Sequence, residues 1–209
     1  MPVACDLYQP FPGLFFWQYF DAAVKADLCS SAILASEKIY LVDPILLEAS
    51  QLDRLCQKAP PAGIIVTNAN HVRASDYYSR ELSVPILAEP ATFRGKKPPQ
   101  FVEIVAGKKI CADLEVIAIE GAVAGEIALY DPLKGGTLIV GDALINFDPP
   151  GFAVLPRKYC LNERQLRQSL WERLTRPAER MLFAHGTPIL SDASAHLRRL
   201  LKSDFKIAL

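Results

Sequence analysis

The sequence of 209 residues contains little of what several chemistries require. It has only three histidines, and its five cysteines are scattered without a CxxC spacing. No apolar run approaches the roughly 20 residues of a transmembrane helix. The first part of the chain also lacks the basic region and long apolar run of a secretory signal. We therefore expect a cytoplasmic protein with no membrane partner, whose cysteines are reduced thiols that mostly fill the core.

An excess of charge of either sign is also missing. Lys plus Arg and Asp plus Glu both number 23, so the sequence predicts no nucleic-acid partner. The 11 glycines form no P-loop, and no GxSxG motif is present. What remains is a globular composition with 51% hydrophobic and 22% charged residues and no low-complexity linker. This predicts one domain that spans residues 1–209.

Apolar runs alternate with helix-like segments in the first half of the chain. Strands are predicted at 15–20, 31–35, 39–42, 63–67 and 84–88, and helices at 46–58 and 74–82. Ser75 or an earlier residue is expected to cap the second helix. The alternation favours parallel strand pairing and a layered α/β fold. The proline-rich stretch 93–100 is expected to be the loop between the two halves.

The second half begins with strands and ends with helices. Strands are predicted at 101–104, 109–119, 126–130, 137–140 and 180–184, and helices at 161–174 and 192–202. The glycine-containing turn between the third and fourth of these strands predicts a hairpin. Asn162 is expected to cap the first helix, and Ser191 precedes the second.

Three of the predicted strands end directly in side chains that can bind a ligand or a metal. In chain order these side chains are Asn68, Asn70 and His71, then Asp142, then His185. In α/β folds, binding sites form in the crevice beyond the strand ends. Three such ends from distant parts of the chain can therefore converge on one pocket.

Four segments together resemble the metallo-β-lactamase superfamily. They are KIYLVDP (38–44), IIVTNANHVR (64–73), IEGAVAGEIALYDPLKGGTLIVGDAL (119–144) and MLFAHGTPIL (181–190). In that family the corresponding segments are an early strand that ends in Asp, a Thr followed by His-x-His-x-Asp-His, a ligand segment with a hairpin and Gly-Asp-Ala-Leu, and a last strand that ends in Gly-His-Gly. The resemblance implies a four-layer αββα sandwich with two mixed sheets packed face to face.

The same resemblance places most of the family's metal ligands on residues that cannot replace them. The first two histidines fall on Asn68 and Asn70, the Asp-His pair on Val72 and Arg73, and the next histidine near Ala122. A neutral amide oxygen is a poor zinc ligand, and two of these side chains offer no donor atom. Arg73 places a permanent positive charge where a cation would sit.

Only Asp142, which matches the bridging aspartate, and His185, which matches the last histidine, keep the ligand type. One carboxylate and one imidazole do not hold a catalytic zinc tightly, so the first hypothesis is a non-catalytic binding protein, a pseudo-enzyme without a cofactor. The alternative is an atypical metal-dependent hydrolase with one zinc, manganese or iron ion held by Asp142, His185 and a third group such as His71.

Each candidate residue also has a structural interpretation. His71 lies between the family's ligand positions, so its side chain is expected to point away from theirs and to have a loop or helix-capping role. Asp142 either contacts a metal or substrate or has a structural role, in which it holds neighbouring loop amides or forms an ion pair with Arg73 that fills the vacated metal position. His185 is either a residual metal ligand or a hydrogen-bonded histidine at the strand end. Asp43 either orients the loop backbone or is a turn residue before a proline.

Asn68 and Asn70 are expected either to contact the polar edge of a ligand or to make turns at the strand end. His196 is predicted to be a surface or packing residue of the last helix. The superfamily hydrolyses β-lactams, thioesters, phosphodiesters and other substrates, so the resemblance selects neither a small-molecule nor a protein partner. Homo-oligomer formation is left open.

Overall fold

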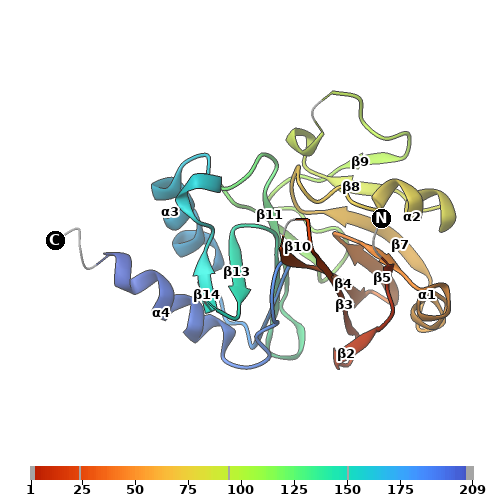
Figure 1. Ribbon diagram of the computed structural model, residues 1–209, viewed down its shortest axis with the longest axis horizontal. Coiled ribbons are helices and arrows are strands. Elements are labelled where there is room, and N and C mark those ends of the chain that lie inside the picture. The colour runs from red at the N-terminus through yellow and green to blue at the C-terminus, as the bar shows by residue number, and fades with distance from the viewer. Residues whose placement is uncertain (1–2, 24, 94, 150, 206–209) are drawn as a thin grey trace.

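A computed structural model describes residues 3–23, 25–93, 95–149 and 151–205. Figure 1 shows two bodies of strands side by side, with helices on the outer flank of each. Arg94, in the proline-rich stretch, lies outside the described residues. No helix in the described ranges is long and apolar enough to cross a membrane.

The first sheet has seven strands and contains most of the first half of the chain. Its order is β2 (Tyr8–Phe11), β3 (Leu14–Asp21), β4 (Ala26–Ala35), β5 (Lys38–Val42), β7 (Pro61–Val66), β8 (Ile86–Ala88) and β9 (Phe101–Glu103). The strands from β2 to β5 pair antiparallel, and those from β5 to β9 pair parallel. The predicted parallel pairing is therefore present, from β5 to β9.

The helices of this half are shorter than the sequence predicted. Helix α1 (Ala49–Cys56) begins later than residue 46, because β6 (Leu46–Leu47) pairs parallel with β1 (Val3–Ala4). The N-cap of helix α2 (Ser75–Glu81) is Ala74, so the cap position falls on a residue earlier than Ser75, and no side-chain hydrogen bond caps the helix. The proline-rich stretch does not separate the halves either, because β9 follows it and joins the first sheet.

The second sheet has four strands in the order β10 (Glu115–Ala118), β11 (Ile127–Asp131), β12 (Thr137–Val140) and β15 (Arg180–Phe183). The first three pair antiparallel, and β12 pairs parallel with β15. A separate hairpin, β13 (Leu144–Phe147) with β14 (Gly151–Val154), was not predicted. Two helices follow the hairpin and β15, respectively: α3 (Glu163–Leu174) and α4 (Ala193–Phe205).

Three apolar clusters define four layers. One cluster lies between the sheets and joins Leu14 and Ile65 of the first to Leu129 and Ile139 of the second. Another packs the first sheet against α1 and α2, and the third packs the second sheet against α3 and α4. Asn162 caps helix α3 as predicted, because its side chain accepts the backbone N–H of residue 165 at 3.1 Å, and the helix begins at Glu163 rather than at residue 161. The fold is therefore the predicted αββα sandwich.

The ends of four strands meet at one edge of the two sheets. Backbone hydrogen bonds join the sheets there: Cys29 N–H donates to Ala184 O at 2.9 Å, and Ile127 N–H donates to Thr67 O at 2.8 Å. The side chains that follow β5, β7, β12 and β15 therefore project into a common space.

Candidate metal centre

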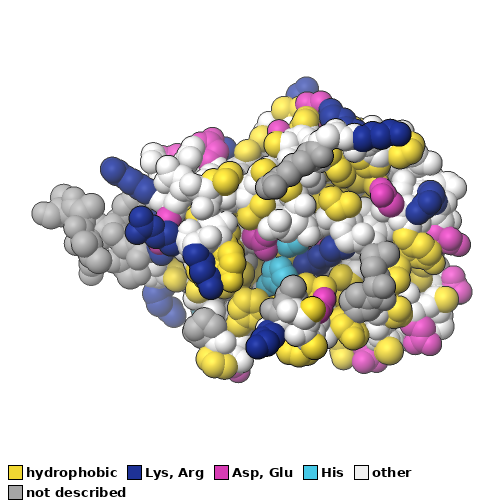
Figure 2. All heavy atoms as spheres, turned by 45° about the horizontal axis from the view of Figure 1, so that its top comes forward, with side chains coloured by type: hydrophobic (Ala, Val, Ile, Leu, Met, Phe, Trp, Pro, Cys, Tyr) yellow, Lys and Arg dark blue, Asp and Glu magenta, His cyan; other side chains and the backbone are white. Residues whose placement is uncertain are grey.

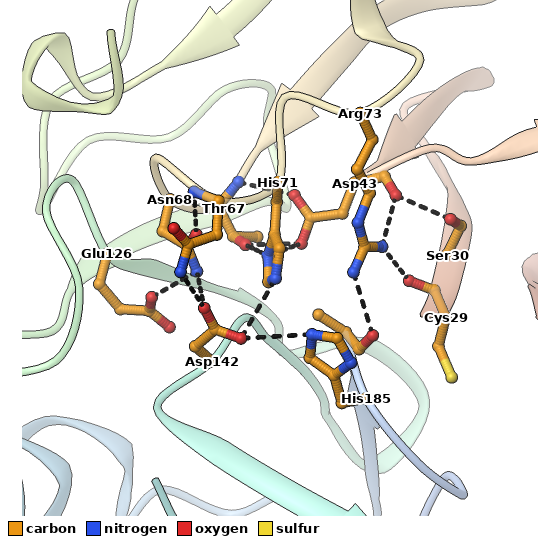
Figure 3. Close-up of polar contacts among 12 residues, drawn as sticks. Cys29, Ser30, Asp43, Thr67, Asn68, His71, Arg73, Glu126, Asp142 and His185 are labelled. Atoms are coloured by element: carbon orange, nitrogen blue, oxygen red, sulfur yellow. Dashed lines mark hydrogen bonds and ion pairs between the residues drawn. The ribbon is translucent and has the colours of Figure 1, made fainter. Parts of the chain in front are cut away.

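The centre is built from the residues that follow those strands (Figure 3). Asp43 follows β5, Thr67 follows β7, Asp142 follows β12, and His185 lies just after β15. Gly141 precedes the aspartate, and a Cβ there would lie 2.5 Å from the Thr67 hydroxyl oxygen. A side chain does not fit at this position, so glycine lets β12 approach the end of β7 closely.

His71 is oriented by a carboxylate on one side of its ring. Its Nδ1 lies 3.0 Å from Oδ2 of Asp43. The other oxygen of that carboxylate accepts the Thr67 backbone N–H at 2.8 Å, and Oδ2 also accepts the Thr67 hydroxyl at 2.5 Å. An ionised carboxylate only accepts hydrogen bonds, so Nδ1 of His71 carries the proton. Its Nε2 then faces Oδ1 of Asp142, 3.2 Å away.

His185 is oriented in the same way by a backbone group. Its Nδ1 lies 2.9 Å from the carbonyl oxygen of Asp27, which can only accept, so this nitrogen also carries a proton. Its Nε2 lies 3.4 Å from the same Asp142 Oδ1. The two imidazole rings are 5.5 Å apart between centroids.

Three electron-pair donors therefore converge. The ligand atoms of His71, Asp142 and His185 all lie within 4.8 Å of one another. His71 is 2% exposed, and its Nε2 has no hydrogen-bond partner of acceptable direction among the described residues. An orphaned buried nitrogen that points at a carboxylate needs a cation between them, either a proton or a metal ion.

Protonation of His71 is one way to satisfy the cluster. Burial acts to lower the pKa of this imidazole, but the carboxylates of Asp43 and Asp142 raise it to about 9. Burial likewise acts to raise the pKa of Asp142, yet His71 holds it far below its usual value. Burial, followed by the charges on His71 and Arg73, lowers the pKa of His185 to about 4, so that ring is neutral at pH 7.

The second oxygen of Asp142 faces amide groups. Its Oδ2 accepts from Nδ2 of Asn70 at 3.0 Å and from Nδ2 of Asn68 at 3.3 Å. The Asn68 side-chain oxygen also accepts the Asn70 backbone N–H at 2.8 Å, which is the expected turn chemistry. Asn68 thus makes the turn that was one of the two expectations, and the side-chain amides of both asparagines bind Asp142. They occupy one side of the carboxylate and leave only Oδ1 for the imidazoles.

Glu126 belongs to this network, although sequence reasoning missed it. It is 3% exposed, and its two oxygens accept from the Asn68 amide at 2.7 Å and from the Ala143 backbone N–H at 2.9 Å. Burial and then the charge of Asp142 raise the pKa of this carboxyl to about 8. The available signal was a glutamate at the start of an otherwise apolar strand.

Two side-chain directions contradict the sequence-based expectations. His71 points into the centre, because a turn closed by its N–H and Asn68 O, at 3.1 Å, ends the alternation of the strand. Arg73 forms no ion pair with Asp142 among the described residues. Its Nη1 donates to Cys29 O at 2.6 Å and to Asp43 O at 3.0 Å, and its Nη2 to Ala184 O at 3.3 Å.

Comparison with known proteins gives the family and the fold of the chain. The family model described as "Metallo-beta-lactamase superfamily" matches residues 7–203. No curated protein matches the sequence.

Several solved structures share the fold. DIM-1 metallo-beta-lactamase has a TM-score of 0.73 and 12% identity over 97% of this chain and 99% of its own. A metallo-beta-lactamase from Pontibacter korlensis has a TM-score of 0.70 and 13% identity over 94% of this chain and 98% of its own. A metallo-beta-lactamase family protein from Thermus thermophilus has a TM-score of 0.65 and 16% identity over 96% of this chain and 80% of its own. With this family match and a shared αββα fold, the chain belongs to the metallo-beta-lactamase superfamily.

Proposed function

We propose that the protein is an atypical metal-dependent hydrolase that holds one divalent transition-metal ion with His71, Asp142 and His185. The observation that carries the proposal is the convergence of two Nε2 atoms on one carboxylate oxygen, with both Nδ1 atoms directed at other acceptors, so that in the neutral rings each Nε2 has its electron pair free for an ion. Two imidazoles and one carboxylate are a donor set of catalytic zinc and of non-haem iron sites. The residues present therefore fit such an ion.

The groups behind the ligands support the same assignment. Metal-binding histidines usually donate their other ring N–H to a carboxylate or a backbone carbonyl, which fixes the ring and increases its basicity. Here the Asp43 carboxylate does this for His71, and the Asp27 carbonyl does it for His185. Both rings are thus held before any ion binds.

The amide contacts limit the centre to one ion. Asn68 and Asn70 direct N–H groups at Oδ2 of Asp142, and an N–H donor repels a cation at that side of the carboxylate. The guanidinium of Arg73 adds a fixed positive charge close by. A second ion would therefore find no free oxygen on Asp142, and the positive charge of Arg73 would repel it.

The chain's own residues define how substrate approaches. When bound, a divalent ion supplies Lewis-acid activation of water and of a substrate carbonyl or phosphoryl group. His71 and Asp142 are buried, whereas His185 is only partly buried, so the approach is from the side of His185. Figure 2 shows histidine side chains at the bottom of a hollow, next to a Lys or Arg side chain.

A binding protein without a metal is the second candidate function. The observation in its favour is the pKa of His71, which the two carboxylates raise to about 9 despite burial. At neutral pH an imidazolium between Asp43 and Asp142 would satisfy the cluster with a proton alone. The hollow would then bind a ligand without hydrolysing it.

Metal content separates the two candidates. Protein purified without a histidine tag or chelator is analysed by plasma emission as wild type, His185→Ala and His196→Ala. The control histidine is exposed on α4, outside the cluster. We expect about one equivalent of zinc, manganese or iron in the wild type and the control and little in His185→Ala. No metal in any variant, with a melting temperature that zinc does not change, would rule out the metal-dependent hydrolase.

A further inference from the structure

Arg73 carries a positive charge that forms no direct ion pair with a carboxylate of the described residues. Its three hydrogen bonds all go to backbone carbonyl oxygens, and no ion pair within 4.0 Å involves it among the described residues. The two nearby carboxylates are used elsewhere: Asp43 faces Thr67 and His71, and Asp142 faces His71 and the asparagine amides. Carbonyl oxygens hold a guanidinium in place but leave its charge unpaired.

Two of its five N–H groups have no partner among the described residues. A guanidinium has five N–H donors, of which Nη1 uses two and Nη2 uses one here. The Nε–H and the second N–H of Nη2 make no hydrogen bond within the described part of the chain. The planar guanidinium presents its donors in a fork that matches the two oxygens of a carboxylate or a phosphate.

The position of Arg73 relates these free donors to the proposed metal ligands. It binds the carbonyl of Asp43, whose side chain orients His71, and the carbonyl of Ala184, which directly precedes His185. Figure 3 shows its guanidinium between these two segments, close to His185. Like His185, Arg73 is only partly buried. A molecule that reaches His185 from the hollow therefore passes the guanidinium.

We propose that Arg73 is a binding residue for an oxyanion, a carboxylate or phosphate group that the substrate carries next to the bond cleaved at the His71, Asp142 and His185 centre. This inference rests on the proposed function for the identity of that centre as catalytic. The chemistry that selects the substrate is the unneutralised guanidinium with its two free donors. The three carbonyl contacts fix its orientation, so little side-chain freedom is lost on binding.

The test uses inorganic phosphate and acetate as probes and Arg73→Lys as the variant. Lysine keeps the positive charge but loses the planar fork, and Arg80→Lys on the exposed face of α2 is the matched control. Titration calorimetry is done on chelator-treated protein and on protein with stoichiometric zinc. We expect at least one probe to bind the wild type and the control equally, and Arg73→Lys at least about tenfold more weakly, with zinc uptake unchanged.

The outcomes separate this inference from the proposed function. Equal probe binding by the wild type and Arg73→Lys overturns the oxyanion site. A wild type that takes up no zinc but binds a probe only with Arg73 intact overturns the proposed function and keeps the anion site. If Arg73→Lys does not fold, a wild-type crystal soaked in phosphate decides: the ion lies on Nε and Nη2 of Arg73, or it lies only elsewhere and the inference is wrong.

Discussion

Replacing Glu126 with glutamine tests whether this buried carboxyl holds a proton in the folded protein. Its pKa is raised from 4.5 to about 8, first by burial and then by the charge of Asp142. The folded protein therefore keeps a proton that the unfolded chain releases in this range. The stability contributed by the group is complete below pH 4.5 and declines as the pH rises toward 8. Glutamine does not titrate, so the variant lacks this decline.

The expected size follows from the width of that window. One pKa unit corresponds to about 1.4 kcal/mol, so the three pH units between 5 and 8 give about 4 kcal/mol. Glutamine also places an amide N–H₂ opposite one of the two N–H groups that now donate to Glu126, that of the Asn68 amide at 2.7 Å or that of the Ala143 backbone at 2.9 Å. This donor–donor contact costs about 1–3 kcal/mol, but the cost does not depend on pH. The pH dependence of the difference therefore isolates the proton.

The assay is urea unfolding of chelator-treated wild type and Glu126→Gln at pH 5, 6, 7 and 8. The free energy of unfolding of the variant minus that of the wild type is expected to increase by about 4 kcal/mol from pH 5 to pH 8. Glu103→Gln, on the exposed part of the edge strand β9, is the control for a change of one charge. A difference between wild type and Glu126→Gln that stays constant within about 1 kcal/mol would refute the reasoning, because a carboxylate ionised at every pH adds no slope.

Three further predictions concern the elements around the centre. Thr67→Val removes the hydroxyl that donates to Asp43. It is expected to lower the free energy of unfolding in urea by about 1–3 kcal/mol and to weaken zinc uptake. Unchanged zinc affinity would contradict the role of Asp43 as the group that orients His71. Gly186→Ala, at φ +93 with its Cβ 2.1 Å from Asn146 O, should lower the melting temperature by several degrees in calorimetry, and a wild-type value would mean that this backbone relaxes freely. Asn162→Ala removes the cap of α3 and should cost about 1 kcal/mol, whereas Asn162→Asp should restore most of it.

The layered fold could be predicted because apolar periodicity decides most of its elements. Runs such as Ile64–Val66 and Ile139–Val140 are buried on both faces, as expected for strands between two layers. The hairpin β13–β14 was not predicted because two prolines and a glycine follow Phe147 in the sequence and interrupt its short apolar runs. The two-residue strand β6 was not predicted, because Leu46 and Leu47 also fit the helical pattern that follows.

The position of the candidate centre could be predicted, but the side-chain directions could not. Strand ends indicated Asn68, Asn70, Asp142 and His185, and the structure brings these residues together. A tight turn, which periodicity does not reveal, then reverses the expected direction of His71.

The other two errors concern the choice of partners. The ion pair between Arg73 and Asp142 was expected from charge alone, yet three carbonyl oxygens bind the guanidinium instead. Glu126 was missed because a glutamate at the start of a strand is normally solvated. Only the tertiary packing shows that it is buried next to Asp142.

The most direct test of the central claim is anomalous diffraction at the zinc edge from crystals of the wild-type protein grown with equimolar zinc. The account predicts one strong peak in contact with Nε2 of His71, Nε2 of His185 and Oδ1 of Asp142, and none on the side of Asp142 that faces Asn70. A map with no peak between the two imidazoles, while zinc appears elsewhere on the protein, would contradict it.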